Sequence, residues 1–311
     1  MAETGGPRFW INRRSAGVAR IHVEGTPDLP FDYSVSLQES AQSLAIIREE
    51  YKGVFERDRD RVTFRSHLLV IGGPFPPNAS ALSQIRHPTE PAATKFVDAL
   101  ESIRLYREFR TGPNAQARTG TAASLLADYL DEDGGNLALR LNEIDLHSGL
   151  RRIEAALKRF FDLFSEVKLL TRGGITQLYV REAGVEEAFA ATSLSDGTLK
   201  LLCLLAVLVD PNPPPLVCIE EPEVGLHPDA IREIAGLLTD ASARTQLIIT
   251  THSPTLIDAL SDQPEAVVIC ERDFDRFTQF RRLDRSKLEE WLERYTLGEL
   301  WQKGEIGGNR W

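Results

Sequence analysis

The amino-acid sequence predicts an α/β fold that also carries an antiparallel β-subdomain and a helical insert. Between residues 175 and 275, short apolar runs rich in β-branched side chains alternate with helical patterns, which is typical of a parallel sheet covered on both faces. Residues 18–71 alternate apolar and polar side chains, as half-buried strands do. Residues 92–164 repeat apolar side chains at helical spacing.

These patterns divide the 311 residues into four segments of one large unit. We expect an antiparallel β-subdomain over 1–78, a helical lobe over 79–165, an α/β core over 166–283, and a C-terminal helix and tail over 284–311. In the lobe, apolar spacing predicts helices through Phe96–Leu105, Leu125–Leu130 and Leu150–Phe161. In the core, we expect strands at Val217–Ile219, Gln246–Thr250 and Ala266–Cys270, the last turning into a hairpin with Thr278–Leu283.

Composition excludes several classes of protein. The net charge of −10 argues against a globally basic nucleic-acid binder. No apolar run approaches the roughly 18 residues that a membrane-spanning helix needs, so we expect no membrane partner. Cys203, Cys218 and Cys270 each lie in an apolar run without CxxC spacing, which predicts buried thiols and a reducing, cytoplasmic setting.

The first motif that carries chemistry is the run 193–198, which directly precedes a long apolar helical stretch. We expect Ser195 to be the N-cap, with its hydroxyl accepting from a backbone N–H two or three residues on. Gly197 lets the backbone approach a ligand closely. A helix N-terminus presents free N–H groups, so this segment suits a phosphate. Taken alone, it is better explained as a plain capped helix under a core.

The second motif is an apolar strand that ends in two adjacent carboxylates, Glu220 and Glu221. Ligands of doubly wound sheets bind at the carboxyl ends of the strands. One carboxylate can hold Mg²⁺ through its water shell, and its neighbour can deprotonate an attacking water. The alternative is a solvated strand end.

Two histidines complete the set. His227 lies in a tight loop that opens the next helix, with Pro228 and Asp229 in its first turn. His252 follows a second buried strand, where a neutral imidazole can donate a hydrogen bond to a phosphate or position a water. Each histidine alone is more simply explained as structural.

In this order and at these spacings, the motifs resemble those of ABC-type ATPases. Residues 194–198 resemble the signature motif, 216–222 a Walker B strand, 223–228 the D-loop, and 251–253 the H-loop. The form Glu-Glu-Pro-Glu-x-Gly-Leu-His-Pro, followed by Thr-His-Ser-Pro, resembles the SMC/RecF-like branch, and especially stand-alone AAA family ATPases of the AbiEii and overcoming-lysogenization-defect type. Transporter subunits are less similar, since their D-loop has Asp where this chain has His227.

The resemblance implies the head of a P-loop NTPase that uses ATP and Mg²⁺. It implies that Glu220 supports the metal, that Glu221 activates water and that His252 senses the γ-phosphate. Contact with nucleotide is implied for four further residues: Ser195, Asp196, Gly197 and His227. Heads of this kind pair with ATP sandwiched between them, so we expect a homodimer, with DNA or an effector protein as a further partner in DNA repair or phage defence.

One expected element is missing from the sequence. A phosphate-binding loop needs Gly-x-x-x-x-Gly-Lys followed by Ser or Thr, and no Gly-Lys pair occurs in the 311 residues. We therefore expect an ABC-type head without its N-terminal loop strand and helix, and weak or no ATP hydrolysis. The explanations are a truncated or mis-assigned start, a loop supplied by another chain, or a degenerate ATPase. A non-catalytic interaction module and, less closely, a transporter subunit are the alternative functions.

Overall fold

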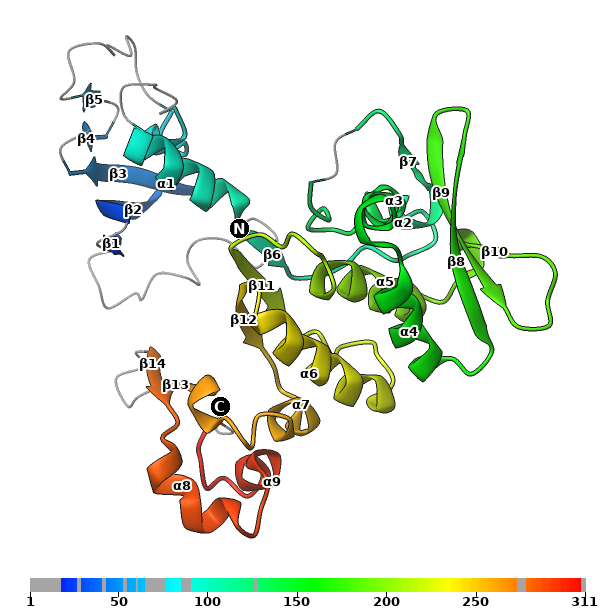
Figure 1. Ribbon diagram of the computed structural model, residues 1–311. Helices are drawn as coiled ribbons and strands as arrows, with labels where there is room; N and C mark the ends of the chain where they lie inside the picture. The colour runs from blue at the N-terminus through cyan, green and yellow to red at the C-terminus, as the bar shows by residue number, and fades with distance from the viewer. Residues whose placement is uncertain are drawn as a thin grey trace. The chain divides into compact units, whose positions relative to one another are not determined.

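The computed structural model divides the chain after Ser102 into two compact units, which we describe separately (Figure 1). The residues that the structure describes are 18–26, 29–40, 43–52, 55–59, 61–64, 76–84, 91–125, 128–272 and 278–308. The division falls inside the range 79–165, for which the sequence predicted one helical lobe.

The N-terminal unit contains a five-stranded antiparallel sheet whose strands follow one another in chain order, which confirms the predicted meander. Its strands are β1 (Val18–Thr26), β2 (Leu29–Ser40), β3 (Ser43–Tyr51), β4 (Phe55–Asp58) and β5 (Arg61–Phe64). The 3-10 helix η2 (Ala81–Gln84) and helix α1 (Pro91–Ser102) complete it. Phe96 of α1 stacks on Tyr51 of β3 with 5.8 Å between ring centroids, so aromatic side chains join the helix to the sheet.

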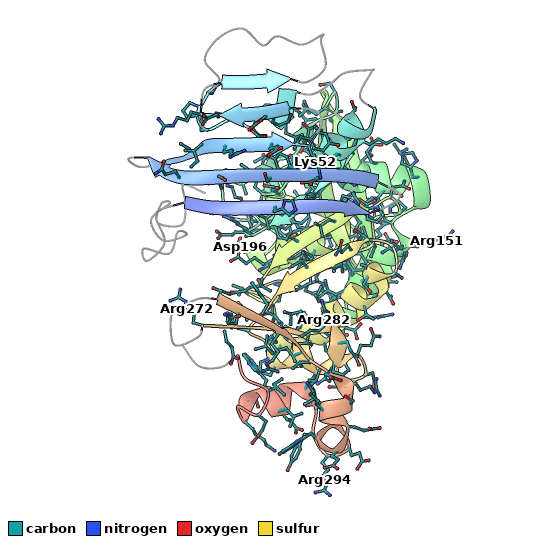
Figure 2. The ribbon with its side chains drawn as sticks, turned by 90° about the vertical axis from the view of Figure 1, so that its left-hand side faces the viewer. Lys52, Arg151, Asp196, Arg272, Arg282 and Arg294 are labelled. Carbon is teal, nitrogen blue, oxygen red and sulfur yellow. The ribbon has the colours of Figure 1, made fainter. Side chains whose placement is uncertain are left out.

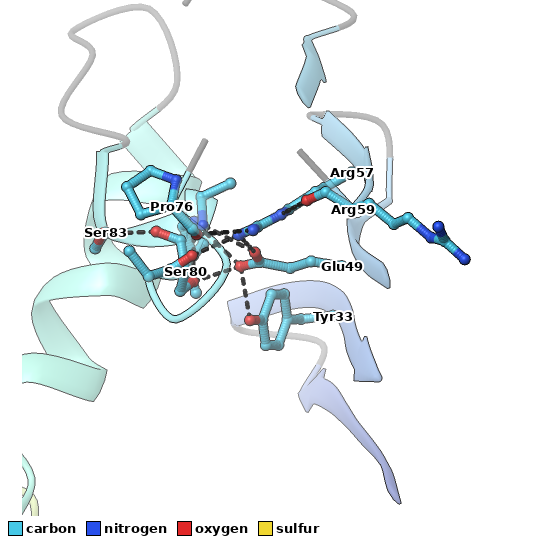
Figure 3. Close-up of polar contacts among 10 residues, drawn as sticks. Tyr33, Glu49, Arg57, Arg59, Pro76, Ser80 and Ser83 are labelled. Carbon is cyan, nitrogen blue, oxygen red and sulfur yellow. Dashed lines mark hydrogen bonds and ion pairs between the residues drawn. The ribbon is translucent and has the colours of Figure 1, made fainter. Parts of the chain in front are cut away.

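A buried charged pair, Glu49 and Arg57, fixes the segment that precedes α1 against this sheet (Figure 3). Both side chains are 0% exposed, and Arg57 Nη1 lies 3.7 Å from Glu49 Oε2. The Glu49 carboxylate accepts hydrogen bonds from the Tyr33 hydroxyl and from the backbone N–H groups of Ala81 and Leu82. Arg57 donates to backbone carbonyls, including that of Pro76. Because both charges have several partners, the pair is a satisfied structural network.

The C-terminal unit contains the predicted parallel strands. They are β6 (Arg104–Tyr106), β11 (Leu216–Glu220) and β12 (Gln246–Thr250), in the order β12-β11-β6, with parallel pairing throughout. The sequence missed β6, since it placed Leu105 on a helix. Three residues are too few to show a period, and only pairing with β11 makes this segment extended.

The main core surrounds helix α5 (Asp196–Leu208), in which every residue from Leu201 to Leu208 is buried. It lies among α3 (Leu137–Ser148), α4 (Arg151–Phe160) and α6 (Pro228–Ser242). A second, antiparallel sheet adds β7 (Thr121–Ala122), β8 (Phe164–Arg172), β9 (Ile175–Glu182) and β10 (Phe189–Ala190), with the short helices α2 (Gln116–Thr119) and η3 (Ala191–Ser193) beside it.

The C-terminal elements differ from expectation in two respects. β13 (Val268–Arg272) forms the predicted hairpin with β14 (Thr278–Arg282), but the pair is a separate antiparallel sheet and does not extend the parallel one. Figure 2 marks Arg272 and Arg282 on this hairpin. The expected single C-terminal helix is two, α8 (Arg285–Leu292) and α9 (Leu297–Gln302). The short helices α7 (Pro254–Asp258) and η4 (Pro264–Ala266) connect β12 to β13.

Two further expectations are wrong. The predicted helix at 125–130 is absent from its described residues: Leu125, Asp128 and Tyr129 form bends, and Leu130 is irregular and buried in the core. Cys270 is exposed, whereas Cys203 is buried and Cys218 partly so. Among the described residues, no helix is long and apolar enough to span a membrane.

Candidate functional site

The candidate site begins where β11 ends. Glu221, the first residue after the strand, has a left-handed backbone with φ of 43°. Its N–H donates to the carbonyl of Thr250 at 2.9 Å, so the pairing with β12 continues one residue beyond β11. A positive φ is uncommon for a residue with a side chain and costs free energy, and such strain clusters at functional sites.

The carboxyl end of β12 brings His252 to the same edge. Its Nε2 lies 3.6 Å from Glu221 Oε1, and both side chains are half exposed. Parallel strands place their carboxyl ends together, so these residues, 31 positions apart by number, become neighbours. The structure therefore brings together the two residues for which catalysis was predicted.

Glu223 holds the loop that carries His252. Its Oε1 accepts from the hydroxyl of Thr251 at 2.6 Å and from the backbone N–H of His252 at 2.9 Å. In the described part of the chain, Glu223 Oε2 is buried and has no hydrogen-bond partner. Sequence reasoning gave Glu223 no role of its own, since its partners lie 28 and 29 residues away.

Glu220 is the last residue of β11. Its side chain is 54% exposed, and Oε2 lies 3.8 Å from Nε of Arg107, the residue that follows β6. A single exposed carboxylate suits Mg²⁺, which keeps several waters and takes its other ligands from phosphates. Among the described residues, no three His, Cys, Asp or Glu side chains lie close enough to hold a metal by themselves. Arg107 is a cation at this edge that sequence reasoning missed along with β6.

The N-terminus of α5 has the predicted cap. Ser195 Oγ accepts from the N–H of Thr198 at 3.1 Å, three residues on, which confirms its N-cap geometry. Asp196, labelled in Figure 2, is 66% exposed and accepts from Arg118 Nη2 at 2.5 Å. Arg118 itself is only 7% exposed, and it also donates to the carbonyls of Ala191 and Leu194. This residue of α2 therefore fixes the segment that leads into α5.

The turn after Glu221 lies against the start of α5. Lys200 Nζ donates to the carbonyl of Val224. Burial lowers the pKa of Lys200, and Glu223, Glu108 and Glu221 oppose that change. A Cβ added at Gly197 would lie 3.2 Å from the carbonyl oxygen of Gly225, so only glycine fits comfortably there.

His227 occupies a different position from the other predicted residues. It is the N-cap of α6, and its Nδ1 accepts from the N–H of Asp229 at 3.3 Å. Its side chain is exposed, with Asp229 Oδ2 3.3 Å from the same nitrogen. The described contacts of His227 are thus local to the start of its own helix.

One family model matches this chain over residues 37–258. Its description reads AAA domain, putative AbiEii toxin, Type IV TA system. The match includes every residue for which a site role was predicted. No curated protein matches the chain.

Several solved structures of SMC ATPase heads are similar to the chain. An SMC ATPase described for ATP-driven dimerization and DNA-stimulated activation is 15% identical over 50% of this chain and 95% of its own, with a TM-score of 0.36. An SMC head bound to the C-terminal winged-helix domain of ScpA is 15% identical over 83% and 76%, with a TM-score of 0.41. The SMC head of Thermotoga maritima is 15% identical over 84% and 78%, with a TM-score of 0.34. At these scores the likeness is too loose to assign any residue.

Proposed function

We propose that this chain, which belongs to the family described as AAA domain, putative AbiEii toxin, Type IV TA system, forms an ATPase head. Its hydrolytic residues in this proposal are Glu221 and His252. The observation that carries the proposal is the pairing of these two side chains, 3.6 Å apart, at the carboxyl edge of two parallel strands. This is the edge at which open α/β sheets bind ligands.

In this proposal Glu221 and His252 have different roles in the attack of one water molecule on ATP. Glu221 accepts the proton of a water that attacks the γ-phosphate, and His252 donates a hydrogen bond to that phosphate. Glu220 would hold Mg²⁺ through its water shell, and the bound ion would supply charge neutralisation at the phosphate oxygens. The left-handed backbone of Glu221 supports this assignment, since strained backbone conformations cluster at functional sites.

The N-terminus of α5 contacts the ATP that is bound to a second copy of the chain. Ser195, Asp196 and Gly197 lie at a helix N-terminus, which binds anions through free N–H groups. We propose that the exposed His227 joins this surface through its own loop, because the carbonyl oxygen of Gly225 lies close to Gly197. ATP bound to one copy then contacts this surface of the other, which gives a homodimer that depends on nucleotide. Arg118 shields the charge of Asp196, which otherwise repels a phosphate.

The phosphate-binding loop has to come from residues other than these 311, which contain no Gly-Lys pair. Among the described residues, β12 pairs only with β11, and Ile248 on β12 is 50% exposed. A strand added in parallel along this free edge would end beside Glu221 and His252, where a loop that follows it reaches the same phosphate. The chain by itself accordingly hydrolyses ATP weakly or not at all.

The description of the family also bears on the physiological setting. The description of the family, together with the motifs, supports phage defence, with DNA repair as the other setting, and DNA or an effector protein as the partner. The net charge of −10 favours a protein effector, or a DNA contact confined to a local cluster such as the arginines of β13 and β14.

A non-catalytic interaction module is the second candidate, and the absence of a Gly-Lys pair from the sequence favours it. Calorimetry with Mg-ATP on the chain as it stands separates the two. An ATPase head without its loop binds ATP weakly, and binding appears when a strand–loop–helix segment with Gly-x-x-x-x-Gly-Lys-Ser is joined to it. No binding in either form supports the module. Tight binding by the chain alone contradicts the module and the claim that a loop is missing.

A further inference from the structure

The turn formed by residues 223–226, here called the connecting turn, contacts two segments that are far apart in the sequence. On one side Glu223 binds the loop that carries His252. On the other side the carbonyl of Val224 accepts from Lys200 of α5. We propose that Glu223 and Lys200 are positioning residues that link His252 mechanically to the N-terminal turn of α5 through this connecting turn.

The link on the His252 side is made by two hydrogen bonds to one oxygen atom. Glu223 Oε1 lies 2.6 Å from the Thr251 hydroxyl and 2.9 Å from the N–H of His252. The Thr251 hydroxyl also accepts from the N–H of Ser253 at 2.9 Å, which is the N-cap of α7. Bonds to a charged acceptor are about twice as strong as neutral ones. The backbone of His252 therefore follows the position of Glu223.

The connecting turn can pass a displacement from Glu223 to α5 because hydrogen bonds within its backbone hold it rigid. The N–H of Val224 donates to the carbonyl of Glu221, and that of Leu226 to the carbonyl of Glu223. Gly225 has a φ of 79°, a left-handed conformation that glycine adopts without strain. Two successive turns of this kind leave little freedom between Glu223 and the carbonyls that face α5.

The link on the α5 side consists of a lysine near acidic side chains and of a close backbone approach at Gly197. Lys200 is half-buried, and the acidic side chains nearest to it include Glu223 and Glu221. Its bond to Val224 lies one helical turn beyond Gly197, whose backbone approaches the carbonyl of Gly225. A displacement of the connecting turn consequently presses on the N-terminal turn of α5, the predicted phosphate surface for a second copy.

The consequence for catalysis rests on the proposed function. When His252 engages a phosphate in one copy, the connecting turn moves the α5 surface that the other copy uses. The structural link does not depend on nucleotide, however, and is tested in the nucleotide-free protein. Failure of the link and failure of the ATPase assignment are therefore separate results.

The test reads backbone amide resonances in the full, isotope-labelled chain. Lys200→Met removes the donor to Val224 and keeps the length of the side chain, so we expect the amide resonance of His252 to shift. Lys200→Arg keeps a donor and restores the resonance. Lys158→Met, an exposed lysine of α4, is the matched control and leaves it unchanged.

A second variant, changed on the His252 side and read out at α5, keeps the test decisive if Lys200→Met does not fold. Thr251→Val removes one of the two bonds to Glu223, and we expect it to shift the amide resonance of Gly197 across the turn. The proposal is overturned if His252 keeps its resonance in Lys200→Met, or if Gly197 keeps its resonance in Thr251→Val while that of His252 moves.

Discussion

Glu221 Oε1 and His252 Nε2 lie 3.6 Å apart across the ends of two neighbouring parallel strands. Neither residue reaches the other through local sequence. The contact exists because β11 and β12 pair in register from Leu216 with Gln246 to Glu220 with Thr250. The sheet register is therefore the structural cause of the candidate site.

The strained backbone of Glu221 makes a prediction about stability. The left-handed conformation costs a residue with a side chain roughly 1–2 kcal/mol, whereas glycine adopts it freely and costs about 0.5–1 kcal/mol through the unfolded state. We expect Glu221→Gly to leave the free energy of unfolding unchanged or to raise it by up to about 1 kcal/mol. Glu220→Gly, in the adjacent strand position, lowers it by about 0.5–1 kcal/mol. Urea unfolding of both variants measures this difference. Equal decreases in the free energy of unfolding would show that the backbone of Glu221 is not strained.

The Arg118 contacts predict a second stability difference. Arg118→Met leaves the carbonyls of Ala191 and Leu194 without their donor, and each buried polar group left unpaired costs about 1–3 kcal/mol. Asp196→Asn costs less than about 1 kcal/mol, because Asp196 is mostly exposed. Arg110→Met, at an exposed ion pair with Asp133, is the control with almost no loss. A loss in Asp196→Asn as large as that in Arg118→Met would show that the ion pair, not the carbonyl contacts, fixes this segment.

The buried pair of the N-terminal unit predicts a large loss. Arg57→Met removes the partner of a fully buried carboxylate, and breaking such a pair costs about 3–5 kcal/mol. Tyr33→Phe removes only one hydrogen bond to Glu49 and costs about 1 kcal/mol. Thermal unfolding of both proteins, followed by circular dichroism, compares them. Similar midpoints in the two variants would contradict a structural role for the Glu49–Arg57 pair.

The three cysteines predict an order of reaction with a thiol reagent. Cys270 is exposed and reacts first. Burial raises the pKa of Cys218, so its thiolate fraction at pH 8 is lower and its reaction is slower, with a rate that rises as the pH is raised. Burial also raises the pKa of Cys203, which reacts only when the protein unfolds. Mass spectrometry of the modified peptides over time gives the order, and early labelling of Cys203 would contradict the packing around α5.

Local patterns explain what the sequence could predict. The cap at Ser195 depends on a neighbour three residues away, Pro228 marks the start of α6, and β11 and β12 are short apolar runs between turns, so residue types alone indicate them. Long-range contacts explain what it could not. β6 is extended only because it pairs with β11, and the partners of Arg118 in the segment that leads into α5 lie more than 70 residues away. Likewise, the hairpin of β13 with β14 was predicted, but the absence of described pairing between β13 and the parallel strands was not, because pairing with distant strands is not encoded in the residues of β13 itself.

The most direct test of the account is single-turnover ATP hydrolysis by the chain joined to a strand–loop–helix segment with Gly-x-x-x-x-Gly-Lys-Ser. Glu221→Gln is compared with the unchanged chain, and Glu186→Gln, in an exposed turn, is the control. A general base contributes about 10²–10⁴-fold to the rate, so we predict a loss of that size in Glu221→Gln with ATP binding preserved, and none in Glu186→Gln. Equal hydrolysis rates in Glu221→Gln and the unchanged chain would contradict the assignment of Glu221 and the ATPase site built around it.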